Sequence, residues 1–276
     1  TMDCAGAAVD EDRIIRAMVG RELTDRYPPR QASIGEPVFE VEDWHVHHPL
    51  HHDREVIKGV SFNVRAGEVV GIAGLMGAGR TELAMSLFGR SWGQRISGKV
   101  RIRGKMADVS SIPRAMAAGL AYVTEDRKTY GLVLIDHIKH NVTLANLGAV
   151  SSHAVIDDMK ELAVANKYRR DLNIRSSSAY QATVNLSGGN QQKVVLSKWL
   201  FSGPDILILD EPTRGIDVGA KYEIYGIVNR LAEEGKAVVV ISSEMPELLG
   251  ICDRIYVMNE GRMVAEMPAS EASQEK

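Results

Sequence analysis

The sequence predicts an α/β domain in which a parallel sheet is covered on both faces. Three observations support this fold class. Short, almost wholly apolar segments, among them DILILD and KAVVVIS, alternate with longer segments of helical periodicity. One apolar segment is followed by a glycine-rich turn that opens a helix, and another ends in two adjacent carboxylates. Helical connections of this kind are what parallel strands require, since each connection must cross the length of the sheet.

Length and composition allow one large domain, or one domain with an inserted subdomain, in these 276 residues. Hydrophobic residues make up 45% and charged residues 25%, as in ordinary globular proteins. A net charge of −3 gives no reason to expect a nucleic-acid partner. Cys4 and Cys252 cannot form a disulfide framework, which favours a reducing cytosol. No apolar run approaches the roughly eighteen residues that a membrane span requires.

Residues 1–35 are expected to form a helix followed by a linker. The segment DEDRIIRAMVGREL offers Asp10 or Asp12 as an N-cap and apolar residues at helical spacing. The following YPPRQ ends that helix, because consecutive prolines cannot continue one. The chain begins with Thr1 and not with methionine, and we expect it to be a piece of a longer polypeptide.

Alternating apolar residues predict strands from Pro37 onward. PVFEVEDWHV forms one strand, and GVSFNVRAGEVVGIAG forms two more with a turn at residues 66–67. Between them, HVHHPLHHD holds five of the eight histidines. Imidazole binds zinc and copper, but no cysteine lies near, so a solvated histidine loop is favoured over a metal site.

The segment from Gly74 to Thr81 has the spacing G-x-x-x-x-G-R-T, which is the pattern of a phosphate-binding loop. Backbone N–H groups of such a loop cradle phosphates, and Thr81 can bind magnesium. Arg80 replaces the usual lysine and keeps the charge, but a planar guanidinium is larger than an ammonium. The candidate nucleotide-binding residues are Gly74, Leu75, Met76, Gly77, Ala78, Gly79, Arg80, Thr81 and Glu82.

The middle of the chain predicts short strands, a helix near Pro113, and a strand, GLAYVT, that ends at Glu125. Residues 131–187 then change character and are expected to form an inserted helical subdomain. Its apolar stripe is expected to be mostly core and consists of Met159, Leu162, Ala163 and Ala165.

Residues 185–219 hold two further signals. LSGGN opens a helix and offers free N–H groups to a phosphate, and DILILD ends in Asp210 and Glu211. This carboxylate pair offers a magnesium ligand and a candidate base for water. A helix over 220–235, a strand over 236–242, a helix over 244–252 and a hairpin that turns at residues 259–261 complete the predicted elements.

The order of these motifs resembles the nucleotide-binding cassette of ABC transporters, over about residues 36–268, with 269–276 as a tail. This resemblance implies a P-loop NTPase fold with a RecA-like core, an antiparallel β subdomain and an inserted helical subdomain. ILILDEP matches the Walker B strand, and RGIDVGA, which contains Asp217, matches the D-loop. ATP and Mg²⁺ are the implied cofactors, with Thr81 and Asp210 on the metal and Glu211 orienting water. The signature residues, expected to face a partner's nucleotide, are Leu186, Ser187, Gly188, Gly189 and Asn190.

GIAGLMGAGRTEL, VTEDRK, LSGGNQQK, DEPTRGIDVGAK and ISSEMPELLG together look like the second cassette of bacterial monosaccharide-importer ATPases of the ribose, galactose and xylose type. Those proteins fuse two cassettes in one chain, so residues 1–35 would be the tail of the first cassette and a linker. The resemblance implies three partners: the first cassette, transmembrane permease subunits and, indirectly, a periplasmic sugar-binding protein. It also implies a place at the cytoplasmic face of the bacterial inner membrane. The sugar itself is not encoded in these motifs.

Several positions depart from the family pattern. Glu125 stands where a glutamine is usual, Ser243 stands at the position of the switch histidine, and Arg80 replaces the phosphate lysine. These departures predict that the chain's own site turns ATP over slowly or not at all, while its signature completes the partner's site. The candidates for stacking on adenine are Trp44, His47 and His48.

Two alternatives stay open: a soluble ABC-type ATPase that acts on DNA or ribosomes, and a regulatory module that binds nucleotide without turnover. The first needs basic surfaces or large insertions, which the sequence lacks. Kinase and GTPase functions are disfavoured, because LSGGN has no role in either.

Overall fold

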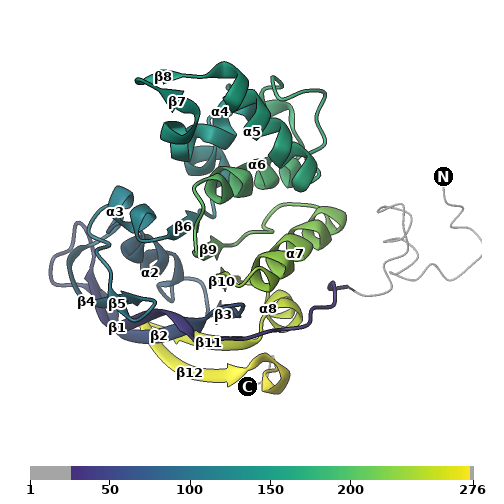
Figure 1. Cartoon of the computed structure of the whole chain (residues 1–276). Helices are drawn as coiled ribbons and strands as arrows, with labels where there is room; N and C mark the ends of the chain where they lie inside the picture. Colours follow the sequence, from purple (N-terminus) through teal and green to yellow (C-terminus); the bar gives the residue numbers. More distant parts are fainter. Residues whose placement is uncertain (1–25, 274–276) are drawn as a thin grey trace, which may run out of the picture.

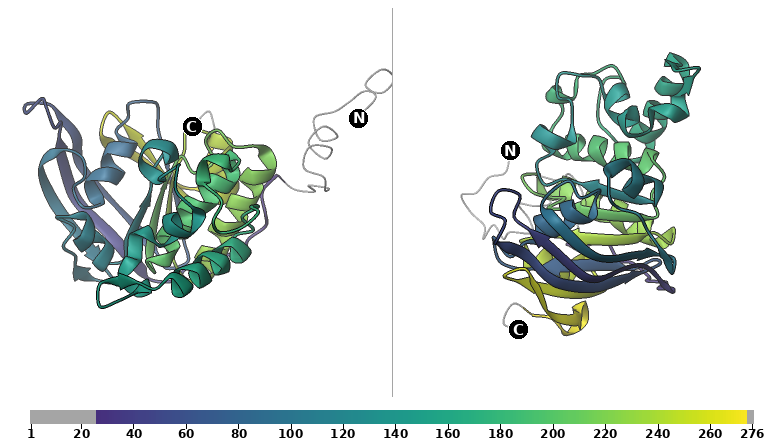
Figure 2. Two further views of the ribbon diagram at one scale, coloured as in Figure 1. Left: turned by 90° about the horizontal axis from the view of Figure 1, so that it is seen from above. Right: turned by 90° about the vertical axis from the view of Figure 1, so that its left-hand side faces the viewer.

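The computed structural model describes residues 26–273 and has two parts (Figure 1). The first part is a core of sheets and flanking helices, and the described segment both begins and ends there. The second part is a helical subdomain that lies over one end of this core (Figure 2, right). The helix predicted within residues 10–23 lies outside the described residues. Among the residues described, no helix is both long enough and apolar enough to span a membrane.

An antiparallel sheet with strand order β2-β1-β4-β5 forms one layer of the core. It comprises β1 (Pro37–His47), β2 (Glu55–Arg65), β4 (Gln94–Ile102) and β5 (Lys105–Met106). The apolar residues that alternate along β1 and β2 point into one cluster, in which Phe39 and Phe62 pack edge to face with ring centroids 5.7 Å apart. The strands predicted over this region are confirmed.

The central sheet has the order β12-β11-β3-β10-β9-β6. All neighbouring pairs are parallel except β12 (Arg262–Pro268), which is antiparallel to β11 (Arg254–Asn259). The other strands are buried at every residue, as their apolar runs predict: β3 (Val69–Ala73), β6 (Leu120–Val123), β9 (Ile206–Asp210) and β10 (Ala237–Ile241).

Each face of the central sheet is covered by a different layer. Along β9, Ile206 and Ile208 join the cluster shared with the antiparallel sheet, whereas Leu207 and Leu209 join a cluster on the opposite face. Helix α2 (Arg80–Leu87) packs in the first cluster, and α7 (Val218–Glu233) and α8 (Met245–Ile251) pack in the second. The short helix α3 (Ile112–Ala117) precedes β6.

The helical subdomain follows β6 and returns to the core through α6 (Gly188–Phe201). Its elements are the π-helical turn η1 (Arg127–Gly131), α4 (Ile138–Thr143), the 3-10 segment η2 (Leu144–Val150), β7 (Ser151–Ser152), β8 (Val155–Ile156), α5 (Asp158–Asp171) and the 3-10 turn η3 (Thr183–Asn185). The β7–β8 hairpin was not predicted in this helical segment.

The predicted apolar stripe of α5 is right for Ala165 and wrong for Met159 and Ala163. Ala165 is buried and Leu162 is half-buried, whereas Met159 is 72% exposed and Ala163 is also exposed. Glu161 is buried on this helix because its carboxylate has partners there: Lys139 Nζ at 3.1 Å and the Thr143 hydroxyl, which donates to it at 2.7 Å. A buried ion pair thus contributes to the inner face of α5, where the pattern predicts apolar residues alone.

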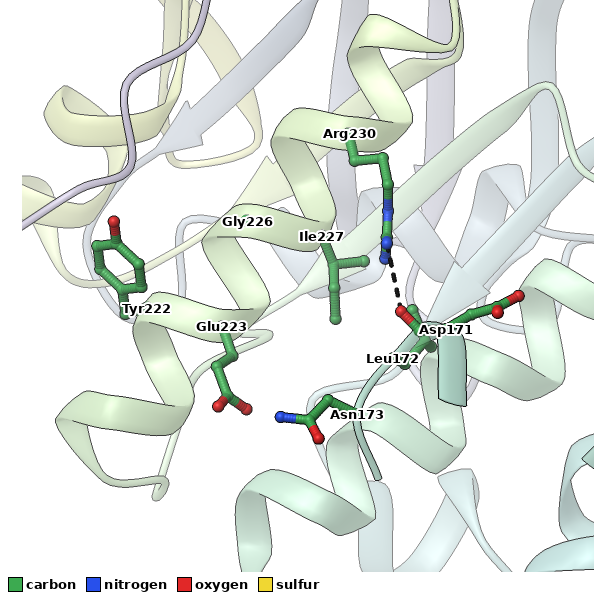
Figure 3. Close-up of a pocket in the computed structure, with 8 residues that line it drawn as sticks. All are labelled: Asp171, Leu172, Asn173, Tyr222, Glu223, Gly226, Ile227 and Arg230. Atoms are coloured by element: carbon green, nitrogen blue, oxygen red, sulfur yellow. Dashed lines mark hydrogen bonds between the residues drawn. The ribbon is translucent and has the colours of Figure 1, made fainter. Parts of the chain in front are cut away.

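A seam joins the helical subdomain to α7, and we define it by Lys193, Asn173 and Glu223. Lys193 of α6 has a side chain only 3% exposed, pairs with the Glu223 carboxylate and donates to the Asn173 carbonyl at 2.9 Å. A pocket of about 300 Å³ opens beside this seam (Figure 3). There Arg230 Nη1 donates to the Asp171 carbonyl at 3.2 Å, which adds a direct contact between α7 and the end of α5.

Candidate functional site

The glycine-rich loop follows β3 and leads into α2, in the context that its sequence predicts. Gly77 (φ +81°) and Gly79 (φ +99°) have left-handed backbone conformations. At Gly74 a Cβ atom would lie 2.4 Å from the Met258 carbonyl oxygen, so only glycine fits. The other predicted loop residues are the exposed Leu75 and Met76, the buried Ala78, and Arg80, Thr81 and Glu82 in the first turn of α2.

Asp210 ends β9 in a buried position beside Thr81. Its Oδ2 accepts a hydrogen bond from the Tyr122 hydroxyl at 2.9 Å, and its Oδ1 is buried with no hydrogen-bond partner in the described chain. Burial raises the pKa of Asp210 to about 6, and the neighbouring hydroxyls of Thr81 and Tyr122 act in the opposite direction. A carboxylate oxygen without a partner next to a hydroxyl is the oxygen donor set of a hard cation, so these residues fit Mg²⁺.

Glu211 is held at the mouth of the same site by Arg80 and Ser243. Its backbone is left-handed (φ +47°), and its N–H donates to the Ile241 carbonyl at 2.8 Å. The Ser243 hydroxyl donates to Oε2 at 3.2 Å. Burial raises the pKa of Glu211, while the Ser243 hydrogen bond and the charge of Arg80 act in the opposite direction.

Arg80 contacts the ends of two strands. Its Nη1 donates to the Ser242 carbonyl at 2.6 Å, and its Nη2 lies 3.7 Å from Oε1 of Glu211. Both side chains of this ion pair are only 10% exposed. The guanidinium that replaces the expected lysine therefore serves as the counter-ion of Glu211 in this structure.

Glu125 lies just beyond β6, whose neighbour in the sheet is β9. Its carboxylate forms an ion pair with Arg214, which follows Glu211 by three residues. A groove of about 450 Å³ runs between these two segments. The structure therefore brings Glu125 to the D-loop segment.

The signature lies at the start of α6 and packs on the D-loop segment. Ser187 is the exposed N-cap residue, and its hydroxyl accepts from Asn190 Nδ2 at 2.9 Å. Gly189 approaches α7 so closely that a Cβ atom there would lie 2.4 Å from Cβ of Ala220. Asp217 caps α7 by accepting from the Ala220 N–H at 2.9 Å. The first signature residue, Leu186, is buried.

Of the three aromatic candidates for adenine stacking, Trp44 is wrong. Its side chain is 1% exposed, and its indole Nε1 donates to the Ser86 hydroxyl at 3.0 Å inside the core. His47 and His48 are partly exposed, and the His48 ring packs against Trp92 with centroids 5.7 Å apart. Which of these two residues meets a base stays a prediction.

The histidine-rich loop contains no grouping of three metal-ligating side chains, within the part of the chain that the structure covers. His48 Nδ1 instead accepts backbone N–H groups of Leu50 and His51. The one such grouping found in residues 26–273 is Asp136, His137 and His140. There one Asp136 oxygen already bonds the His137 N–H at 2.7 Å and His140 Nδ1 at 2.6 Å, so hydrogen bonds just before and within α4 account for the cluster.

Sequence reasoning missed two residues of this region. Tyr122 is a buried strand residue whose hydroxyl bonds Asp210, and its only signal was a tyrosine within an apolar strand. Arg127 contacts both the D-loop carbonyls and the signature, and only its place in VTEDRK could have indicated it.

Comparisons with known proteins agree with this geometry. Residues 57–214 match the ABC transporter family. The chain is 57% identical over its full length to the L-arabinose transport ATP-binding protein AraG of Geobacillus stearothermophilus, of which it covers 54%. It is 46% identical over 97% of its length to the ribose import ATP-binding protein RbsA of Bacillus subtilis, of which it covers 52%. The chain thus spans about half the length of the curated relatives that it matches.

Solved structures show the same fold at low sequence identity. A nucleotide-free ATP-binding cassette from an ABC transporter superposes with a TM-score of 0.72 at 20% identity, over 84% of this chain and 91% of that one. A dimeric post-hydrolysis cassette bound to ADP and Pi gives 0.70 at 19% identity, over 84% and 98%. Because the ABC transporter family matches more than half of the chain, at residues 57–214, the chain belongs to that family.

Proposed function

We propose that this chain is the second cassette, residues 36–268, of a two-cassette ATPase that energises monosaccharide import through a membrane permease. The similarity to arabinose and ribose transport proteins supports the substrate class, and the coverage of about half their length is compatible with a preceding cassette. Residues 1–35 would then be the tail of that cassette and a linker. The permease would hold the chain at the cytoplasmic face of the bacterial inner membrane, and a periplasmic sugar-binding protein would deliver the sugar.

In the chain's own site, ATP would lie on the glycine-rich loop and Thr81 and Asp210 would hold Mg²⁺. A magnesium ion bound there would neutralise part of the phosphate charge. The open oxygen of Asp210 supports this assignment. Glu211 would orient water if hydrolysis occurred.

The single observation that carries the asymmetry of the proposal is the position of Arg80. Its guanidinium is engaged by the Ser242 carbonyl and Glu211, so both the charge expected on the phosphates and the carboxylate expected to handle water are already paired. Ser243 stands at the switch position, where a histidine is usual. It supplies a hydroxyl that donates to Glu211 in place of an imidazole. The exposed Ser187 and the two glycines that follow it keep the residues of the family pattern. Residues 186–190 would therefore complete the partner's catalytic site, while this chain's own site works weakly.

The test compares Ser187→Arg with Glu211→Gln in the full two-cassette protein assembled with its permease. Ser187→Arg should lower steady ATPase activity by about 10²–10³-fold, the usual effect of removing a positioned donor at a phosphate. Glu211→Gln should leave that activity largely unchanged. Ser152→Arg, a matched change at an exposed serine of the β7–β8 hairpin, is the control. Loss of activity in Glu211→Gln with none in Ser187→Arg would refute the asymmetry.

A second test asks whether Arg80 serves the phosphates. The affinity of this chain for fluorescent ATP should rise about tenfold in Arg80→Lys, because a lysine would leave the Glu211 pair and meet the phosphates as a point charge. Arg114→Lys, at an exposed arginine of α3, should leave the affinity unchanged. Weaker binding in Arg80→Lys would show that the guanidinium already contacts the nucleotide.

A further inference from the structure

The turn over residues 125–131 follows β6 in the chain and is bonded to α6. At its start, Oδ1 of Asp126 accepts the N–H groups of Lys128 and Thr129, each at 3.0 Å, which orders the turn internally. At its end, the Gly131 carbonyl accepts from Lys198 Nζ of α6 at 2.6 Å. The turn thus connects the end of β6 with the signature helix.

Arg127 extends from this turn into the contact between the D-loop and the signature. Its Nη1 donates to the Arg214 carbonyl at 2.9 Å and its Nη2 to the Gly215 carbonyl at 3.5 Å. The same Nη2 atom lies 2.8 Å from the point where a Cβ atom of Gly188 would be. Gly188 therefore packs directly against the guanidinium.

The surroundings of Arg127 are unfavourable for its charged guanidinium, which indicates that the residue has a positioning role. Its Nε is buried without a hydrogen-bond partner among residues 26–273, and burial lowers the pKa of its guanidinium, opposed by the charge of Asp126. The fixed fork of a guanidinium reaches both carbonyls from two different nitrogens while its plane packs on a glycine, a geometry that the single nitrogen of a lysine does not reproduce.

A second contact crosses the same interface close by. The Glu125 carboxylate pairs with the side chain of Arg214, whose carbonyl receives Arg127. Glu125 and Arg127 of the turn thus both contact Arg214 of the D-loop, the first through its side chain and the second through its backbone carbonyl. Because Arg214 follows Glu211 by three residues, these contacts connect the Walker B edge of the chain's own site with the start of α6.

We propose that Arg127 is a positioning residue that holds Gly188 of the signature in fixed register with the carbonyls of Arg214 and Gly215. Resting on the proposed function, this assigns to Arg127 the task of aligning the signature amides with the partner's nucleotide. The residue touches no nucleotide itself and acts through Gly188.

The first test needs no partner and no turnover. Hydrogen exchange of the amides at the start of α6 is measured in this chain for wild type, Arg127→Gln and Lys128→Gln, an exposed neighbour on the same turn. Loss of a charged hydrogen-bond pair should speed exchange about tenfold in Arg127→Gln. Lys128→Gln should exchange like wild type. Unchanged exchange in Arg127→Gln, or equal acceleration across the whole chain, would overturn the proposal.

The second test uses the full two-cassette protein with its permease. Arg127→Gln should lower kcat for ATP about tenfold while the fluorescent-ATP affinity of this chain's own site and its Tm stay near wild type. Arg127→Lys should not restore kcat, because it keeps the charge and loses the fork. Rescue by lysine, or a parallel fall in affinity and Tm, would contradict a positioning role. If Ser187→Arg is harmless while exchange still accelerates in Arg127→Gln, the proposed function fails and the role of Arg127 stands.

Discussion

Asp210→Asn should stabilise the magnesium-free chain at neutral pH, although it removes a functional group. Burial raises the pKa of Asp210 from its ordinary value of 3.8 to about 6, a shift of about 2 units that corresponds to about 3 kcal/mol. Because the native state binds the proton more tightly than the unfolded state, wild-type stability falls as pH rises from about 4 to about 6. Asparagine avoids this loss and still offers an oxygen to the Tyr122 hydroxyl.

Urea denaturation of wild type and Asp210→Asn at pH 4, 5, 6 and 7.5, without magnesium, measures the effect. The two unfolding free energies should be close at pH 4, and the variant should lead by up to about 3 kcal/mol at pH 7.5. Asp205→Asn, at the exposed opposite end of the same strand segment, removes only a surface ion pair with Arg103 and should change stability by under about 1 kcal/mol at both extremes. A variant that is no more stable than wild type at pH 7.5, or a gap that does not depend on pH, would refute the reasoning.

Two further changes test the packing described above. Gly189→Ala should cost about 1–3 kcal/mol of stability in thermal unfolding, because its Cβ would lie 2.4 Å from that of Ala220. Gly226 is a helical glycine with open space around it, so Gly226→Ala should be neutral or stabilising. Equal effects of the two changes would contradict the close contact at Gly189. Lys193→Ala should cost about 1–3 kcal/mol in urea denaturation, because it removes the buried ammonium from the seam while Arg175 Nη2 still lies 3.6 Å from the Glu223 carboxylate. Lys167→Ala, in an exposed pair with Asp171, should cost under about 0.5 kcal/mol. A similar small loss in both would show that the seam does not depend on the charge of Lys193.

The sheets and the glycine-rich loop could be predicted because their signals are local. Apolar runs specify the buried strands β3, β9 and β10, and glycine spacing specifies a loop that a Cβ atom at Gly74 would disrupt. The place of Thr81 and Asp210 in the fold was predictable for the same reason, since Thr81 lies in the first turn of α2 and Asp210 ends β9.

What the sequence could not predict depends on irregular backbone and on contacts between distant segments. Trp44 is one of the three candidates for stacking on adenine, but a bulge in β1, with Asp43 at φ +48°, shifts the alternation so that Val41 and Trp44 both face the core. Arg127 meets the carbonyl of Gly215 across 88 residues of sequence, and no periodicity reports such a contact. Glu161 is buried through its ion pair with Lys139, which a hydrophobic pattern cannot show.

The hydrogen bond from Tyr122 also limits how Asp210 can coordinate a cation. With Oδ2 accepting the tyrosine hydroxyl, Oδ1 is the carboxylate oxygen that is open to a cation, so we expect Asp210 to bind one through a single oxygen. Ca²⁺ takes both oxygens of a carboxylate readily and tolerates seven or eight ligands, whereas Mg²⁺ prefers single oxygens in a tight octahedron. At the proposed metal site, the phenolic hydroxyl of Tyr122 would therefore favour Mg²⁺ over Ca²⁺.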